Sequence, residues 1–183
     1  MKKYELTSET LQFAGHTLHR IKALKDFGVF TAGELGGWIE SEENLSQADN
    51  AWVYGDAKAY ANAKVYGNAH VYRNAKIYNE ASVYGNACVH DFAEIYNDVK
   101  VFGNAEICGC AKVCNNADYI VFKNFWSSGR YFTWTRSNNK WSVGCFYGTG
   151  DELIKKAYAD SEKSGKEYER VVRYVESILA DEK

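Results

Sequence analysis

One six-residue phrase repeats twelve times without a gap between Asn50 and Val121; NAWVYG, NAKVYG and NAEICG are three of its copies. The second position is alanine in eleven copies and Val99 in the other. The fourth position is valine, isoleucine or alanine in every copy but the last, where Tyr119 stands. A short repeat of constant length is typical of a solenoid in which each copy supplies one short parallel strand. This repeat constrains the fold more than any other feature of the chain.

The alternation within the phrase predicts which side chains point inwards. Successive residues of a strand face opposite sides, so the small apolar second and fourth positions share one face and the first, third and fifth share the other. A glycine or asparagine at the sixth position, as at Gly55 and Asn79, tolerates a sharp corner. Three such sides close a triangular coil of eighteen residues, and twelve phrases predict about four coils.

Stacked coils make residues eighteen apart vertical neighbours. Outward aromatic columns and one asparagine ladder are therefore expected on the prism. So much exposed aromatic surface predicts self-association, and we expect a homotrimer. The predicted columns are Tyr54–Tyr72–His90–Cys108, Tyr60–Tyr78–Tyr96–Cys114 and Tyr66–Tyr84–Phe102–Ile120, and the predicted ladder is Asn50–Asn68–Asn86–Asn104.

The repeat resembles the hexapeptide-repeat, left-handed β-helix family, in which an aliphatic residue follows a small residue two places before it. The resemblance covers about two-fifths of the chain. It implies a mainly β fold, a left-handed parallel β-helix of about four triangular coils. The fifth position departs from the family, which usually has Gly, Ala, Asp or Glu where this chain has tyrosine.

Two segments outside the repeat look like parts of small proteins encoded in phages and prophages, many of them labelled polymer-forming. These segments are RIKALKDFG…GELGGWIESEENLS and GRYFTWTR…SVGCFYGTGDEL. The resemblance implies no chemistry. It suggests an accessory or counter-defence role in the cytoplasm of a host bacterium.

The chain divides into three segments by composition. Residues 1–49 lack the repeat and are expected to cap the open end of the solenoid, with strands at Tyr4–Leu6 and His16–Leu24. Trp38 and Ile39 are the expected plug. Residues 50–121 form the β-helix, and residues 122–183 form a C-terminal module.

The C-terminal module is predicted to be ββαα. Aromatic-rich runs at Arg130–Arg136 and Lys140–Phe146 flank a turn and predict a hairpin. Thr149 and Ser164 each begin a capping box, which predicts two helices. The second helix carries one apolar stripe, formed by Tyr168, Val171, Val172, Val175, Ile178 and Leu179.

Composition excludes several classes of protein. A net charge of −2 argues against a sequence-specific nucleic-acid binder or a protein that binds acidic membranes. No run of eighteen apolar residues predicts a membrane-spanning helix, and no apolar run follows the N-terminal lysines as in a signal peptide. Five cysteines, without a disulfide spacing, fit a reducing cytoplasm.

The predicted hairpin is the leading candidate site. The stretch between Asp118 and Asp151 has four basic residues, no acidic ones and many aromatic rings. Guanidinium groups beside rings suit an anionic, planar ligand. In the alternative, the rings pack on the helices and the arginines only extend to solvent. The predicted binding residues are Arg130, Phe132, Trp134, Arg136, Lys140, Trp141 and Thr149.

A metal site and an enzyme are weaker alternatives. Cys88 and His90 would lie directly below Glu106 and Cys108, but a flat sheet spaces side chains roughly 5–7 Å apart whereas zinc needs ligands at about 2.0–2.3 Å. We therefore predict no metal and no cofactor. The hexapeptide family includes acyltransferases, and that resemblance implies a histidine base; His70 is the other candidate beside His90, although no loop interrupts the repeat.

The sequence thus favours a non-catalytic protein that binds a host protein or a nucleotide-like anion. An acyltransferase and a self-assembling structural module remain open.

Overall fold

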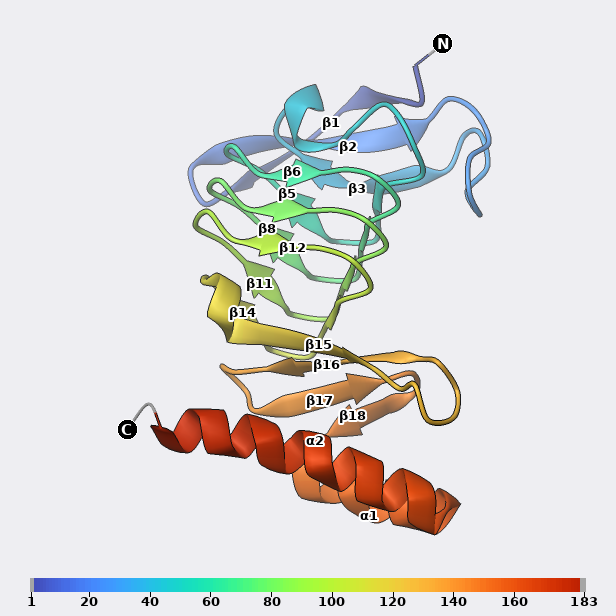
Figure 1. Cartoon of the computed structure of the whole chain (residues 1–183). Coiled ribbons are helices and arrows are strands. Elements are labelled where there is room, and N and C mark those ends of the chain that lie inside the picture. The colour runs from blue at the N-terminus through green and yellow to red at the C-terminus, as the bar shows by residue number, and fades with distance from the viewer. Residues whose placement is uncertain (1, 182–183) are drawn as a thin grey trace. The chain divides into compact units, whose positions relative to one another are not determined.

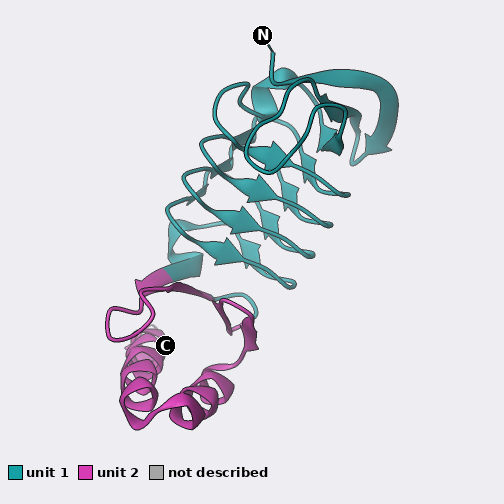
Figure 2. Ribbon diagram, turned by 90° about the vertical axis from the view of Figure 1, so that its right-hand side faces the viewer, with its two compact units in different colours: residues 1–120, 135–138 teal, residues 121–134, 139–183 magenta. Residues whose placement is uncertain are grey.

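The computed structural model describes residues 2–181 and divides them into two compact units (Figures 1 and 2). Unit 1 contains the chain up to residue 120 together with residues 135–138. Unit 2 contains residues 121–134 and 139–183. None of the described helices combines the length and apolarity needed to cross a bilayer.

Unit 1 is built around a parallel β-solenoid, as the repeat predicts. Its strands are two residues long and stack in three ladders, each of which forms one side of the coil. We name these ladders by their strands: the β4–β13 face, the β6–β12 face and the β5–β14 face. The strands are β4 (Trp52–Val53), β5 (Lys58–Ala59), β6 (Lys64–Val65), β7 (His70–Val71), β8 (Lys76–Ile77), β9 (Ser82–Val83), β10 (Cys88–Val89), β11 (Glu94–Ile95), β12 (Lys100–Val101), β13 (Glu106–Ile107) and β14 (Lys112–Val113).

The register of the ladders is eighteen residues. Cys88 pairs in parallel with His70 on one side and with Glu106 on the other. The second and fourth positions fill the interior, where Ala69, Val71 and their equivalents are fully buried. The predicted stacking and the predicted inward set are therefore confirmed.

The sixth position of the phrase turns the corner with a positive φ. Gly85 (φ 69) is one of five glycines there, and Ala61, Arg73, Asn79, Asp91 and Asn97 adopt the same left-handed conformation. Only some corners require glycine. A Cβ on Gly85 would lie 2.9 Å from the backbone nitrogen of Gly103 in the next coil, whereas a Cβ on Gly103 would meet nothing.

The N-terminal cap continues one side of the prism. β1 (Tyr4–Phe13) and β2 (His16–Ala23) form an antiparallel hairpin, and β3 (Leu35–Ile39) joins it to the β5–β14 face (Figure 1). The predicted strand at Tyr4–Leu6 is therefore longer than expected. The seven-stranded sheet has the order β1-β2-β3-β5-β8-β11-β14.

A partial coil precedes the repeat. Ile39 pairs with Ala59, and Leu45, just after the 3₁₀ turn η1 (Glu42–Asn44), pairs with Val65; both side chains are fully buried. Ile39 is thus part of the predicted plug. Trp38 as an interior plug is wrong, because it aligns with the outward Lys58 and packs against Leu18 and Tyr60 outside the prism.

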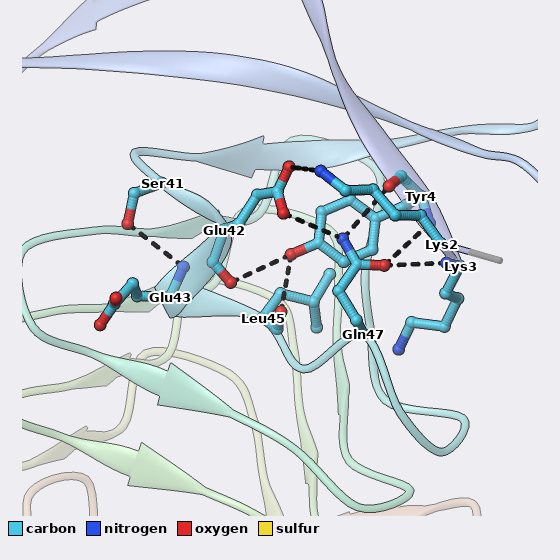
Figure 3. A network of polar contacts seen from close by, with 8 residues as sticks. All are labelled: Lys2, Lys3, Tyr4, Ser41, Glu42, Glu43, Leu45 and Gln47. Atoms are coloured by element: carbon cyan, nitrogen blue, oxygen red, sulfur yellow. Dashed lines mark hydrogen bonds and ion pairs between the residues drawn. The ribbon is translucent and has the colours of Figure 1, made fainter.

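A polar network fastens the first strand to the segment before the repeat (Figure 3). The Gln47 carboxamide accepts a hydrogen bond from the Lys3 backbone at 2.8 Å, and the Tyr4 hydroxyl donates to the Leu45 carbonyl at 2.6 Å. The Lys3 ammonium donates to two backbone carbonyls, one of them that of Ala51 at 2.8 Å. Burial lowers the pKa of Lys3 to about 8.

The last phrase of the repeat leaves the coil. Its first residues form the 3₁₀ turn η2 (Asn116–Asp118), whose Asp118 carboxylate accepts hydrogen bonds from the backbone of Cys114 and Asn115. Tyr119 follows in an extended conformation and donates its hydroxyl to the Lys100 carbonyl at 2.9 Å. A tyrosine at the fourth position therefore marks the end of the solenoid.

Unit 2 contains more strands than the predicted ββαα. The predicted strand Lys140–Phe146 is two strands, because the chain turns at Gly144, which has a φ of 58°. The sheet has the order β15-β16-β17-β18, followed by two helices. The elements are β15 (Tyr119–Lys123), β16 (Tyr131–Thr135), β17 (Lys140–Val143), β18 (Phe146–Gly148), α1 (Gly150–Asp160) and α2 (Glu162–Asp181).

One of the two predicted capping boxes is present. Thr149 caps α1: its hydroxyl accepts from the Glu152 backbone, and the Glu152 carboxylate accepts from the Thr149 backbone at 2.7 Å. The second box is wrong. α2 begins three residues earlier than a cap at Ser164 would place it, and the Ser164 backbone donates to the Ser161 hydroxyl.

Candidate functional site

The outward tyrosines stack as flat columns. Tyr54 and Tyr72 lie 5.0 Å apart with 10° between their planes, and the His90 ring continues the column 4.7 Å from Tyr72. Tyr60–Tyr78–Tyr96 and Tyr66–Tyr84–Phe102 stack in the same way at 4.8–5.3 Å. The aromatic members of all three predicted columns are confirmed, and the Asn50–Asn68–Asn86 part of the ladder is joined by side-chain hydrogen bonds.

The β4–β13 face carries the chemically reactive side chains of the coils. His70, Cys88 and Glu106 occupy its third positions in successive coils, and His90 and Cys108 occupy fifth positions. The equivalent positions on the other faces are lysines, serine, glutamate and aromatic rings, with Cys114 at the end of one column.

His90 lies between two carboxylates and is almost fully buried. Its Nε2 atom is 3.3 Å from Glu106 Oε1, and its Nδ1 atom is 3.2 Å from Asp91 Oδ2. Asp91 stands at the neighbouring corner, where Arg73 and the Gly109 backbone donate to its carboxylate. Partial burial would raise the pKa of Asp91, but these hydrogen bonds outweigh burial and lower the pKa.

His70 and Cys88 are neutral groups on the same face. Burial lowers the pKa of His70, whose ring lies 5.7 Å from Phe30 and 6.1 Å from Tyr54. Burial, with the nearby Glu106 carboxylate, raises the pKa of the Cys88 thiol. The thiol is therefore a weak nucleophile, and the imidazole is available in its basic form at neutral pH.

In unit 2 the predicted aromatic ligand contacts belong to the hydrophobic core. Phe132 and Trp134 are 1% exposed and Trp141 is 2% exposed. Phe132 packs against Tyr168 of α2 at 5.1 Å and against Trp141. The rings are therefore packed in the interior of unit 2 and are not exposed for stacking on a ligand in this structure, and their binding role stays a prediction.

The two arginines belong to different units. Arg136 lies in the 135–138 turn of unit 1, where its backbone donates to the Asp118 carbonyl at 2.8 Å and its Nε to the Ala117 carbonyl at 3.3 Å. Arg130 is exposed in unit 2, just before β16. Lys140 is half-buried at the start of β17, and the backbone of Thr149 is already bound by Glu152.

Arg130 lines a pocket of about 270 Å³ within unit 2, which we call the Arg130 pocket. Lys156 of α1 supplies a second cation, and among the described residues neither cation forms an ion pair. One carboxylate, Asp160, also lines it. The remaining lining residues are Asn124, Ser127, Ser128, Val143, Phe146, Leu153, Ala157, Ser164 and Tyr168.

The loop that begins the Arg130 pocket is held in place by a buried amide. Asn124 is 2% exposed, and its Nδ2 donates to the Ser127 hydroxyl at 2.9 Å and to the Tyr168 hydroxyl at 3.1 Å. Its Oδ1 accepts from the Ser127 backbone at 2.9 Å. Arg130 was a sequence candidate, but Lys156 and Ser164 were not, because they come from helices whose docking the sequence did not reveal.

The chain matches no protein-family model. Over 62 residues it is 37% identical to a protein of Escherichia coli (strain K12) described as uncharacterized acetyltransferase YdcK. The match covers 30% of this chain and 19% of that protein, so the chain spans about a fifth of the length of the relative it matches. The parallel coils and the eighteen-residue register agree with this similarity. The chain is a β-solenoid built from a six-residue repeat. A match of this length does not assign an activity to the chain.

Proposed function

We propose that the hexapeptide-repeat protein is a non-catalytic binding protein that takes a small anionic ligand in the Arg130 pocket. The observation that carries the proposal is the pair of cations without ion-pair partners, Arg130 and Lys156, on one pocket within unit 2. Two positive charges against the single carboxylate of Asp160 give the site a net attraction for an anion.

The chemistry of the lining favours a phosphate group. A guanidinium can hold two phosphate oxygens at once, and an ammonium adds a point charge. Ser128 and Ser164 provide hydroxyl donors, and Val143, Phe146 and Leu153 provide apolar surface for the rest of the ligand. A phosphate-bearing, nucleotide-like molecule satisfies all three features, and a volume of about 270 Å³ limits it to a small one.

A titration with a defined probe set tests this function. Inorganic phosphate, a panel of mononucleotides and an acidic peptide are each titrated by calorimetry into the whole protein. We expect a mononucleotide to bind best, and Arg130→Ala or Lys156→Ala to weaken it tens of fold, because a lost charged hydrogen bond costs about 1.5–3 kcal/mol.

The helix offers a matched control. Lys155 is exposed on α1 beside Lys156 but does not line the pocket, so Lys155→Ala should bind like the wild type. Equal loss in both lysine variants would show only a general charge effect. Binding of the acidic peptide alone would replace the nucleotide-like ligand with a partner protein.

An acetyltransferase is the second candidate, and the similarity to an uncharacterized acetyltransferase favours it. His70 is then the better base. Its lowered pKa keeps it neutral, whereas both nitrogens of His90 face carboxylates. Tight binding of acetyl-CoA that is unaffected by Arg130→Ala, with acetyl transfer lost in His70→Ala, would establish this function in place of the first.

Self-association also stays a proposal. Tyr66 is 39% exposed and Phe102 50% exposed at the two ends of one column. We propose that this column joins subunits in a homotrimer. Light scattering should then give three times the 20.7 kDa chain mass, and a monomer at micromolar concentration would contradict it.

A further inference from the structure

We infer that His90, Asp91 and Cys108 form a binding site for a divalent metal ion of the zinc class on the β4–β13 face. Each residue offers one ligand atom, and the three atoms lie within 4.8 Å of one another. Imidazole nitrogen, carboxylate oxygen and thiolate sulfur are the three ligand types that zinc accepts in proteins.

The decisive atom is Nδ1 of His90. It is buried and has no hydrogen-bond partner, although Asp91 Oδ2 lies 3.2 Å away. A buried imidazole nitrogen without a partner is costly in a folded protein. Two zinc ligands with bonds of about 2.0–2.1 Å in a tetrahedron lie roughly 3.3 Å apart. Nδ1 and Oδ2 therefore have the spacing of two atoms that share a metal ion.

The neighbouring residues hold both ligands in position. His90 Nε2 lies 3.3 Å from Glu106 Oε1, and in the tautomer that carries its proton on Nε2 it donates to this carboxylate and keeps the lone pair on Nδ1. Arg73 and the Gly109 backbone bind the Asp91 carboxylate, and Tyr72 stacks on the His90 ring. Histidine ligands commonly have such a carboxylate behind them.

This arrangement differs from the square predicted from the sequence. The sequence placed Cys88 and Glu106 among the ligands with His90 and Cys108, and the flat geometry argued against a metal. The corner residue Asp91 replaces them, because its φ of 61° turns the chain so that its carboxylate approaches the His90 ring. A corner lies out of the plane of the sheet, so three ligands can surround an ion there.

Three protein ligands leave one tetrahedral position for water or for a small ligand. The Asp91 side chain is 27% exposed, so an ion can enter from the corner. Binding converts the Cys108 thiol to a thiolate, and its proton goes to solvent. The site is in unit 1 and does not depend on the Arg130 pocket in unit 2.

Cobalt titration of the whole, metal-free protein tests the site. We expect one equivalent of Co²⁺ to give a thiolate-to-cobalt charge-transfer band and the intense visible bands of a tetrahedral ion, and one equivalent of Zn²⁺ to displace it. Zn²⁺ should also raise the melting temperature.

Two variants and a control make the result specific. Cys108→Ser removes the sulfur without disturbing the Tyr72 stack, so it should fold normally and lose the charge-transfer band. His90→Gln should weaken binding at least tenfold. Cys110→Ser, an exposed cysteine in the same coil, should bind like the wild type. No cobalt spectrum in the wild type, or the same spectrum in Cys108→Ser, would overturn the site.

Discussion

The β4–β13 face and the β5–β14 face are built from the same phrase in the same register, yet they differ in their outer chemistry. Behind both faces the interior positions are fully buried alanine, valine and isoleucine. The β5–β14 face carries lysines and a glutamate, with Lys76 and Glu94 in an ion pair at 2.9 Å. The β4–β13 face carries His70, Cys88 and His90.

The comparison separates what fixes the fold from what is free to vary. Small and aliphatic side chains at two of six positions set the coil, and backbone hydrogen bonds between coils set the register. The third and fifth positions face outwards, so their exchange leaves the coil intact. Reactive side chains can therefore occupy the outward positions of one face without destabilising the other two faces.

The largest expected effect tests whether the interiors behind the two faces are equivalent. Ala69 lies behind the β4–β13 face and Ala75 behind the β5–β14 face, and both are fully buried. Changing either to leucine overfills the prism and should cost about 1–3 kcal/mol of unfolding free energy. Denaturant unfolding of both variants measures this loss of unfolding free energy. A loss in only one variant would show that the interiors differ.

A corner substitution should have the next largest effect. Gly85→Ala places a Cβ 2.9 Å from the Gly103 backbone nitrogen in addition to a strained φ of 69°. Gly103→Ala has the strain without the contact. The left-handed conformation alone costs about 1–2 kcal/mol, so Gly85→Ala should lose more than that and Gly103→Ala should not. Equal losses in thermal or denaturant unfolding would contradict the close approach between coils.

Alkaline pH should weaken both faces. Burial, then the nearby Cys88, raises the pKa of Tyr72 to about 12, and burial, then Glu94, raises the pKa of Tyr78 to about 12. Tyrosine in the unfolded chain titrates near pH 10. The stabilisation is therefore complete below about pH 10 and is lost as the pH rises through about 12.

Denaturant midpoints across that pH range measure the loss. Tyr72→Phe and Tyr78→Phe should each make the midpoint less dependent on pH, because each removes one shifted group. A midpoint that stays constant between about pH 10 and about 12 in the wild type would contradict the burial of these hydroxyls.

The smallest expected effect is a loss of stability whose dependence on salt differs between the two faces. Glu94→Gln removes the ion pair with Lys76, whose members are partly exposed, and should cost about 0.2–1 kcal/mol at low salt. High salt should reduce the difference from the wild type. Glu106→Gln on the other face loses its contact with His90, which is an ion pair only when the imidazole is protonated, so its effect should depend less on salt. A stronger salt dependence for Glu106→Gln than for Glu94→Gln would contradict this difference between the two faces.

The solenoid could be predicted from the sequence because every residue in it follows from one period. Stacked Tyr60 and Tyr78, buried Ala69 and the corner at Gly85 are all consequences of an eighteen-residue coil. The partial coil at Ile39 and Leu45 could not be predicted, since these residues pair with partners twenty residues away and break the period.

The candidate sites depended on packing that no period specifies. Phe132 and Trp134 alternate with polar residues in the sequence, but Phe132, Thr133 and Trp134 are all buried, and Phe132 packs against Tyr168 of α2. Lys156 reaches the Arg130 pocket from α1. The sequence analysis does not single out Asp91, because its approach to His90 follows from the left-handed turn that it makes at the corner.

Native mass spectrometry of the protein as purified from cells, repeated with a mononucleotide panel, tests most directly whether the ligand site lies in unit 2 and not on the coils. We expect a small anionic species on the wild type, on Lys155→Ala and on Cys108→Ser, and its absence from Arg130→Ala and Lys156→Ala. An anion that remains on Arg130→Ala would contradict the proposed function, and one that is lost only from His70→Ala would place the site on the β4–β13 face.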